Sequence, residues 1–360
     1  MERIYKYDAV ALGEVMLRLD PGEERIRTAR NFKVWEGGGE YNVIKGLKKC
    51  FGLNTAKNTA LAENETGFLL EDLIMQGGVD TELICWKETD GVGKKCRNGI
   101  NFTEKGFGIR GMLGCSDRAN TAVSQLKAED IDFDRIFGEM GVQWLHTGGI
   151  FAALSPNSVD IIERAIEKAH QYGATVSYDL NFRASLWSEM GNADQIIALN
   201  RRIASKVDVL IGNESEFSVC LGIKEPENPD KTQDVLNQKG FEYVLLETKK
   251  QYKNLKAIAA VLHQSESASK TSLVGVGLMQ QKIYRSKSFY DIDVFDAVGA
   301  GDAFGSGVIY GLMKLNDMQA GLDYGVANSA YVMTTPGDTT MAKKYELDAV
   351  LKNGCASQNR

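Results

Sequence analysis

The chain has 360 residues, of which 43% are hydrophobic and 25% are charged, proportions typical of a globular protein with a sizeable core. Its formal net charge is -6, so it lacks the excess of basic residues that nucleic-acid-binding surfaces carry, and we expect no nucleic-acid partner. No apolar run reaches the roughly 18 residues that a membrane-spanning helix needs, so we expect no membrane partner either.

Apolar segments of strand length alternate with amphipathic segments of helix length along most of the chain. In chain order we expect strands at residues 9–12, 55–61, 142–146, 174–178, 207–211, 243–246 and 258–262, and helices at residues 41–51, 66–75, 158–172, 195–205, 304–313 and 320–333. This alternation predicts an α/β fold, in which helices cover both faces of a mainly parallel sheet.

Two stretches, at about residues 15–36 and 91–118, interrupt this alternation and have no helical period. We expect them to pair as a small extra sheet that projects from the core, although two long loops would also fit. Long loops without structure are uncommon in a compact domain and are usually functional, and a sheet that covers a site would be a lid. Residues 224–231 and 264–272 are expected to be polar surface loops, and the end after residue 353 to be frayed.

The cysteines and histidines give no sign of a disulfide framework or a zinc site. The six cysteines contain no C-x-x-C pair, and their irregular spacing is typical of reduced thiols. The three histidines lack metal-ligand spacing, which disfavours a zinc enzyme and a Ser-His-Asp hydrolase. Since the N-terminus also lacks the apolar centre of a signal peptide, we expect a cytoplasmic protein.

The most informative motif is the run DAVGAGDAFGSG at residues 296–307. A glycine turn precedes an apolar-periodic segment, and such a turn directs free backbone N–H groups and the positive end of the helix dipole at one point. An anion is expected there, and Asp302 lies at the same junction. A carboxylate beside a bound phosphate is costly unless it takes a proton from the attacking hydroxyl. The alternative is an ordinary acidic first turn, but the further glycines Gly305 and Gly307 indicate a close approach of backbones.

A second glycine cluster, Gly37 to Gly39, opens the helix expected at residues 41–51. Gly38 and Gly39 would let a small ligand contact the backbone, and Asn42 could bind its hydroxyl groups. A flexible turn followed by a helix cap explains the cluster equally well.

Two further polar clusters follow expected strands, at the end of a parallel sheet where ligands bind. In the first, Asp179, Asn181 and Arg183 include a guanidinium that can clamp a carboxylate or a phosphate, or form a surface ion pair with Asp179. In the second, Asn213 and Glu216 offer the oxygen ligands that Mg²⁺ prefers, although helix capping alone would also account for them.

Together these clusters resemble the ribokinase-like (PfkB) family of sugar kinases over nearly the whole chain. The D-T-x-G-A-G-D motif of that family is matched at residues 296–302 except at Ala297, its G-G-x-x-N motif by Gly38, Gly39 and Asn42, and its N-x-x-E motif by Asn213 and Glu216. The resemblance implies a three-layer α/β/α sandwich with a mainly parallel central sheet and a small β-sheet lid. The core would comprise residues 1–14, 37–90 and 119–345, the lid residues 15–36 and 91–118, and the C-terminal tail residues 346–360.

The resemblance also implies roles for the residues of the late motif. Asp302 would be the base for the sugar hydroxyl, and the backbone amides of Gly299, Ala300 and Gly301 would form the anion hole for the transferring phosphate. Gly38, Gly39 and Asn42 would bind the sugar.

Further roles concern the cofactors and the lid. The resemblance implies ATP and Mg²⁺, with Asn213 and Glu216 near the triphosphate, Glu216 near the metal and Asn328 beside the nucleotide. It leaves open a monovalent cation. The lid of this family often mediates dimers, so a homodimer through the lid is expected.

Within the family the chain is most similar to 2-keto-3-deoxygluconate kinases. The resemblance implies that Arg118 and Arg183 neutralise the carboxylate of a sugar acid, which would be phosphorylated to its 6-phosphate. Asn101 and Ser116 replace tyrosines that bind the keto acid in that subfamily. The expected strand segment at residues 245–250 lacks the glycine usual in the nucleotide-side turn, which leaves the nucleotide preference open. A fructokinase or another neutral-sugar kinase is the alternative. A sugar-binding regulatory protein without turnover is less favoured, because Asp302 and the glycine turn are intact.

Overall fold

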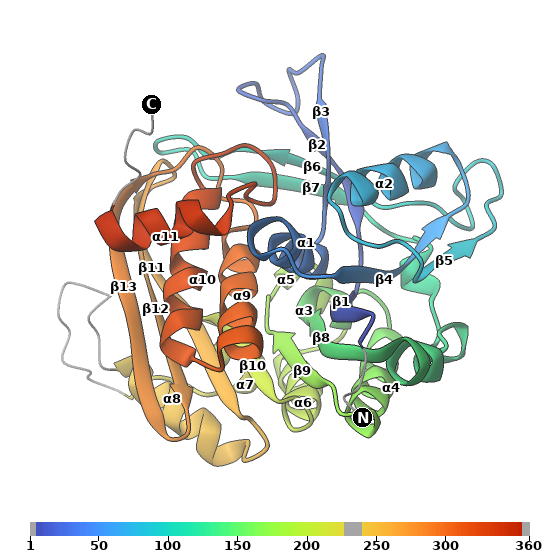
Figure 1. Cartoon of the computed structure of the whole chain (residues 1–360). Coiled ribbons are helices and arrows are strands. Elements are labelled where there is room, and N and C mark those ends of the chain that lie inside the picture. Colours follow the sequence, from blue (N-terminus) through green and yellow to red (C-terminus); the bar gives the residue numbers. More distant parts are fainter. Residues whose placement is uncertain (1–4, 227–239, 355–360) are drawn as a thin grey trace.

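A nine-stranded sheet forms the centre of the computed structural model, which describes residues 5–226 and 240–354 (Figure 1). The strand order is β13-β12-β11-β10-β9-β8-β1-β4-β5. Neighbours from β11 to β5 are parallel, whereas β12 and β13 are antiparallel additions at one edge. The strands are β1 (Tyr7–Leu12), β4 (Thr55–Ala62), β5 (Ile84–Lys87), β8 (Val142–Gly148), β9 (Thr175–Asp179), β10 (Val209–Asn213), β11 (Ala257–Ser267), β12 (Lys270–Met279) and β13 (Lys282–Asp293).

Helices cover both faces of this sheet, and each face has its own apolar core. On β1, Ala9 and Ala11 point into the core beneath α1, α9 and α10, while Val10 and Leu12 point into the core beneath α4, α6, α7 and α8. The predicted three-layer α/β fold is therefore confirmed. The helices are α1 (Gly39–Phe51), α2 (Glu65–Gln76), α3 (Gly149–Ala152), α4 (Ser158–Gln171), α5 (Ala184–Trp187), α6 (Ala193–Ala204), α7 (Glu216–Leu221), α8 (Gly240–Gln251), α9 (Ala300–Tyr310), α10 (Met318–Val332) and α11 (Lys344–Asn353).

The two stretches without helical period form a separate four-stranded sheet, here named the small sheet. It contains β2 (Met16–Asp20), β3 (Lys33–Gly37), β6 (Ile100–Glu104) and β7 (Leu113–Asp117), in the order β3-β2-β6-β7. The small sheet extends beyond one end of the central sheet (Figure 1), so the expectation of a small projecting sheet is confirmed and that of two loops is not.

Three sequence-based expectations were wrong. Residues 243–246, expected as a strand, lie within α8, because Phe241, Val244, Leu245 and Thr248 are buried at helical spacing. Residues 245–250 therefore form no nucleotide-side turn, and their lack of glycine says nothing about nucleotide preference. Most of the polar loop expected at residues 264–272 instead continues the β11–β12 hairpin.

Part of the segment expected as a C-terminal tail, residues 346–360, is helical and packs on the core. Much of it belongs to α11, whose Leu347 and Val350 pack against Cys50 and Ala327. Residues 355–360 of the end expected to fray after residue 353, and residues 227–231 of the other expected loop, lie outside the described residues. Within the described ranges, no helix combines the length and the apolar character required to cross a membrane.

Gly305 and Gly307 in α9 make a matched test of packing. A Cβ on Gly307 would lie 2.2 Å from the backbone nitrogen of Gly325, so the close backbone approach expected from the sequence occurs there. A Cβ on Gly305 would meet only methyl groups of Val43, at 3.5 Å, and Ile211, at 3.9 Å, which are ordinary contacts. We expect Gly307→Ala to lower the free energy of unfolding by about 1–3 kcal/mol through overpacking.

In the same urea titration, Gly305→Ala is the control and should be neutral or stabilising, because alanine is favoured over glycine in a helix by about 1 kcal/mol. Equal unfolding midpoints for the two variants would contradict the described packing of α9 on α10.

Candidate active site

A cavity of about 1030 Å³ lies where the carboxyl ends of the parallel strands meet the small sheet. Several loops that follow strands of the central sheet line it, as expected for ligand sites of α/β folds. The N-terminus of α9 and the inner side of the small sheet complete the wall. The lining residues expected from the sequence are Gly38, Gly39, Asn42, Asn101, Arg118, Asp179, Asn181, Arg183, Asn213, Glu216, Gly299, Ala300, Gly301 and Asp302.

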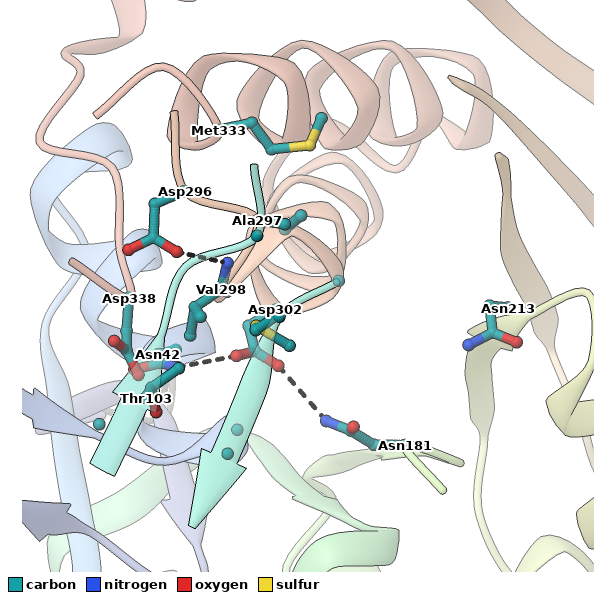
Figure 2. Close-up of a pocket in the computed structure, with 18 of the residues that line it drawn as sticks. Asn42, Thr103, Asn181, Asn213, Asp296, Ala297, Val298, Asp302, Met333 and Asp338 are labelled. Atoms are coloured by element: carbon teal, nitrogen blue, oxygen red, sulfur yellow. Dashed lines mark hydrogen bonds between the residues drawn. The ribbon is translucent and has the colours of Figure 1, made fainter. Parts of the chain in front are cut away.

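Asp302 is held at the wall of this cavity by two carboxamides (Figure 2). Asn42 donates from Nδ2 to Oδ2 of Asp302 at 2.8 Å, and Asn181 donates from Nδ2 to Oδ1 at 3.4 Å. Asn181 has a φ of +28°, an uncommon value for a residue other than glycine. Motifs from α1, from the end of β9 and from α9 therefore converge on one carboxyl group.

The surroundings of Asp302 keep its proton affinity high. Burial raises the pKa of Asp302 from 3.8 to about 7, against the Asn42 hydrogen bond and the nearby charge of Arg183, which lower it. The charges of Asp338 and Glu40 raise it further. A carboxyl group with a pKa near neutrality can both accept and release a proton under physiological conditions.

Beside this carboxyl group, the start of α9 offers backbone N–H groups to the cavity. Gly299 adopts a φ of +80°, and a Cβ there would lie 1.7 Å from the carbonyl oxygen of Asp338, so only glycine fits. A Cβ on Gly301 would meet nothing within 4 Å, so this position is open. In the described part of the chain, the amides of Gly301 and Asp302 have no backbone acceptor. The backbone N–H groups of residues 299–302, here named the cradle, thus lie at a helix N-terminus, a geometry that favours anions.

The glycines before α1 allow the close approach of these elements. A Cβ on Gly38 would lie 2.2 Å from the carbonyl oxygen of Glu14, and one on Gly39 would lie 2.9 Å from Nδ2 of Asn181 and 3.5 Å from Oδ1 of Asp302. Gly38 is therefore required for the close approach to the Glu14 backbone, and Gly39 leaves room for the side chains of Asn181 and Asp302.

Asn213 and Glu216 lie on the cavity wall, and both also accept hydrogen bonds from the backbone around them. Oδ1 of Asn213 accepts from the backbone N–H groups of Ser215 and Glu216, as in ordinary helix capping. The buried Glu216 carboxylate accepts from the backbone N–H groups of Phe182 and Asn213, both at 2.8 Å. Burial raises the pKa of Glu216. Each carboxylate oxygen keeps a free lone pair, so Glu216 could still contact a hydrated Mg²⁺, which needs only one or two protein carboxylates.

The two arginines expected to bind a sugar acid differ in their surroundings. Arg118 forms an ion pair with the buried Glu14, donating from Nε to Oε2 at 2.9 Å and also from Nη2. Arg183 donates only to the carbonyl oxygen of Phe182, at 3.0 Å, and among the described residues it forms no ion pair, not even with Asp179. Arg183 is therefore the arginine whose charge remains available to an anionic ligand.

Asn101 and Ser116 face each other on β6 and β7 of the small sheet. Ser116 donates from Oγ to Oδ1 of Asn101 at 2.9 Å, and Asn101 donates from Nδ2 to Oγ1 of Thr103 at 2.8 Å. The positions expected to contact the sugar thus carry a short polar network along the cavity wall.

Asn328 does not lie on the cavity wall, and the expectation that it lies beside the nucleotide needs correction. It is fully buried on α10. Its Nδ2 donates to Oγ of Ser306 at 2.9 Å and to the carbonyl oxygen of Ala303 at 3.2 Å. Because both contacts are to α9, this carboxamide joins the two helices, and the neighbouring Ser329 reaches the cavity instead.

The cavity residues missed from the sequence include Glu14, Arg18, His263 and Asp338, which carry charged or titratable side chains. Arg18 and Asp20 do alternate with leucines on β2, which indicates a polar face. His263 on β11 lies 3.3 Å from a carboxylate oxygen of Glu214, and this contact raises its pKa. No pattern marks Asp338, which lies in irregular chain after α10.

Comparisons with known proteins point to a single family. Residues 6–344 match the model described as pfkB family carbohydrate kinase. A relative from Haloferax volcanii, named 2-dehydro-3-deoxygalactonokinase, is 26% identical over 98% of this chain and 99% of its own length. A second, from Geobacillus kaustophilus, is named 5-dehydro-2-deoxygluconokinase and is 24% identical over 98% and 96%. The solved structure of 2-dehydro-3-deoxygluconokinase from Thermotoga maritima is 31% identical, covers 96% of this chain and 99% of its own, and has a TM-score of 0.86.

Sugar kinases of this family use ATP and a divalent metal. The family model covers almost the entire chain, and the cavity brings the buried carboxyl group of Asp302 next to the N–H groups of the cradle, an arrangement that suits transfer of a phosphoryl group to an alcohol. The chain therefore belongs to the pfkB family and is a carbohydrate kinase.

Proposed function

We propose that this kinase phosphorylates a keto-deoxy sugar acid, with 2-keto-3-deoxygluconate as the favoured substrate and its 6-phosphate as the product. The observation that carries the proposal is the meeting of Asp302, with a pKa of about 7, and the cradle in one cavity. The names of the three relatives support the substrate class, because each refers to a dehydro-deoxy derivative of a hexonic acid. The unpaired Arg183 supports an acidic substrate.

In this proposal the sugar lies against Gly38, Gly39 and Asn42, with its primary hydroxyl toward Asp302. The hydroxyl oxygen attacks the γ-phosphorus of ATP as its proton passes to Asp302, and the bond from phosphorus to the β-phosphate oxygen breaks to release ADP. The cradle N–H groups stabilise the charge on the equatorial oxygens of the transferring group. Asn42 and Asn181 keep the accepting carboxylate in position.

The proposed nucleotide path runs along the ends of β10 and β11, past Asn213, Glu216 and His263. Glu216 fits a hydrated Mg²⁺, which would neutralise phosphate charge when bound there. A requirement for a monovalent cation stays a prediction, and exchanging K⁺ for a bulky organic cation in the assay buffer tests it.

We propose that the small sheet acts as the lid of the sugar site. Its β6–β7 loop contacts the β11–β12 hairpin, where the Gly108 N–H donates to Oγ of Ser269 at 2.8 Å and the Ala268 N–H donates to the carbonyl oxygen of Gly108 at 2.9 Å. Through these contacts the β6–β7 loop covers the cavity between the proposed sugar site and the proposed nucleotide path. Such a cover limits the access of water and thereby the wasteful hydrolysis of ATP.

A neutral keto sugar is the second candidate, and the Glu14–Arg118 ion pair favours it. The charge of Arg118 is already balanced, so a substrate carboxylate placed there would meet the Glu14 carboxylate as well. The tests below separate the two candidates.

The first prediction concerns Asp302. Asp302→Asn cannot accept the proton, and we expect at least a 100-fold loss of kcat, about the lower limit for general-base catalysis, with little change in folding. In the wild type, kcat/KM should fall about tenfold per pH unit below about pH 7, because protonated Asp302 is inactive as a base. A coupled assay of ADP release across pH measures both effects.

Near-normal turnover of Asp302→Asn would refute the assignment of the base. A kcat/KM that stays flat down to pH 5 would show that the ionisation of Asp302 does not limit the reaction.

The second prediction concerns Arg183. Arg183→Ala should raise KM for 2-keto-3-deoxygluconate more than KM for fructose, because only the acid loses a charge partner. It should also move the acid limb of the pH profile to higher pH, since Arg183 lowers the pKa of Asp302. Kinetics with 2-keto-3-deoxygluconate, fructose and ribose side by side check this.

A rise in the KM for ATP alone would place Arg183 on the phosphates. Equal effects on acidic and neutral sugars would argue against a sugar-acid clamp.

The third prediction is a homodimer through the small sheet. Phe107, Ile109, Met112 and Leu113 are exposed in or beside its β6–β7 hairpin, with Ile109 fully exposed. Large apolar side chains gathered at one tip favour contact with a second copy. Light scattering should give about twice the chain mass, and Ile109→Asp combined with Leu113→Asp should give a monomer. A wild-type monomer at micromolar concentration would contradict this prediction.

A further inference from the structure

Arg18 on β2 of the small sheet is a buried cation that lines the cavity. Arg18 is 1% exposed. Its Nη2 lies 2.7 Å from Oδ2 of Asp296, and its Nη1 lies 2.5 Å from Oδ1 of Asp338. Asp20 on the same strand lies 3.7 Å from Nη2. All three aspartates are buried as well, so the guanidinium is the charge that holds three carboxylates together.

Two of these carboxylates fix the chain on either side of the cradle. Oδ1 of Asp296 accepts from the backbone N–H of Val298 at 3.1 Å, directly before Gly299 (Figure 2). The backbone of Asp338 packs so tightly on Gly299 that a Cβ there would lie 1.7 Å from its carbonyl oxygen.

Asp338 also contacts the other glycine cluster. A Cβ on Gly37 would lie 2.2 Å from Oδ2 of Asp338. The side chain of Asp338 therefore packs between Gly37 and the guanidinium of Arg18. The position of Asp338 therefore links the sugar side of the cavity to the cradle.

A guanidinium holds Asp296 and Asp338 in fixed positions better than an ammonium group would. Its planar fork reaches two carboxylates from different segments at fixed angles, which a flexible point charge does not. Without a cation, buried carboxylates this close would repel one another or take up protons. Both Nη atoms of Arg18 are engaged by aspartates, so Arg18 would influence a ligand through Asp296 and Asp338.

We propose that Arg18 is a positioning residue for phosphoryl transfer. Through Asp296 and Asp338 it fixes the backbone N–H groups of the cradle relative to the carboxyl group of Asp302, and because it belongs to β2 it couples the cradle to the placement of the small sheet. This inference rests on the proposed function of the cradle as the site of the transferring phosphate.

The test compares Arg18→Ala and Arg18→Lys with the wild type. A small misplacement of reacting groups can cost about 100-fold in rate, so we expect kcat of Arg18→Ala to fall about 100-fold, while KM for sugar and ATP change much less. Arg18→Lys, which keeps the charge and loses the fork, should fall in between. Guanidinium chloride at concentrations well below denaturing ones should restore part of the kcat of Arg18→Ala, whereas NaCl at equal ionic strength should not.

Arg25→Ala is the matched control, because Arg25 also forms an ion pair within the small-sheet region, with Glu104, and does not line the cavity. Its kcat should equal that of the wild type. Thermal unfolding of every variant separates a loss of fold from a loss of positioning.

Amide hydrogen exchange gives a readout that does not depend on turnover. The Val298 amide should exchange faster in Arg18→Ala than in the wild type and in Arg25→Ala. Folded Arg18 variants with wild-type kcat and unchanged exchange at Val298 would overturn the proposal, and Arg18→Lys alone decides it if Arg18→Ala does not fold. A wild-type protein that phosphorylates no sugar would refute the proposed function, while the exchange experiment would still report on the role of Arg18.

Discussion

The interaction on which the rest of the site depends is the burial of one carboxyl group, Asp302, against the N-terminus of α9. Burial raises the pKa of this group and the Asn42 hydrogen bond and the charge of Arg183 lower it, so that the pKa lies at about 7. The result is a group that can take a proton beside a cluster of free N–H groups. The glycines around it are needed because a Cβ on Gly39 or Gly299 would occupy the space in which these elements meet.

Charge balance around the cavity explains how so many carboxylates are tolerated in one place. Arg18 lies among Asp20, Asp296 and Asp338, and Arg118 neutralises Glu14. Both arginines come from the small sheet or its immediate end, whereas most of their partners come from the central fold. The small sheet thus supplies positive charge to the cavity in addition to forming part of its wall. Removing either arginine would leave a buried carboxylate without its partner, which is usually far more costly than losing a surface ion pair.

Sequence reasoning succeeded where a local pattern determines the structure. Six strands of the central sheet and six helices followed from apolar periodicity, and the glycine motifs located the cavity residues because each motif ends a strand or begins a helix. It failed at residues 243–246, since a short apolar run fits a buried strand and one face of a helix equally well. The partners of Arg18 and Arg118 could not be read from the sequence either. Arg18 and Asp338 are 320 residues apart, and Arg118 and Glu14 are 104 apart, so only the fold brings them together.

The central claim is that Asp302 and the cradle act on one hydroxyl and one phosphate. A crystal structure of the kinase with ADP, aluminium fluoride, Mg²⁺ and 2-keto-3-deoxygluconate tests it most directly. The account predicts the aluminium fluoride on the N–H groups of the cradle, residues 299–302, and the primary hydroxyl of the sugar within about 2.6–3.2 Å of an Asp302 carboxylate oxygen. A hydroxyl directed at another side chain, or a fluoride group bound away from the cradle, would contradict it.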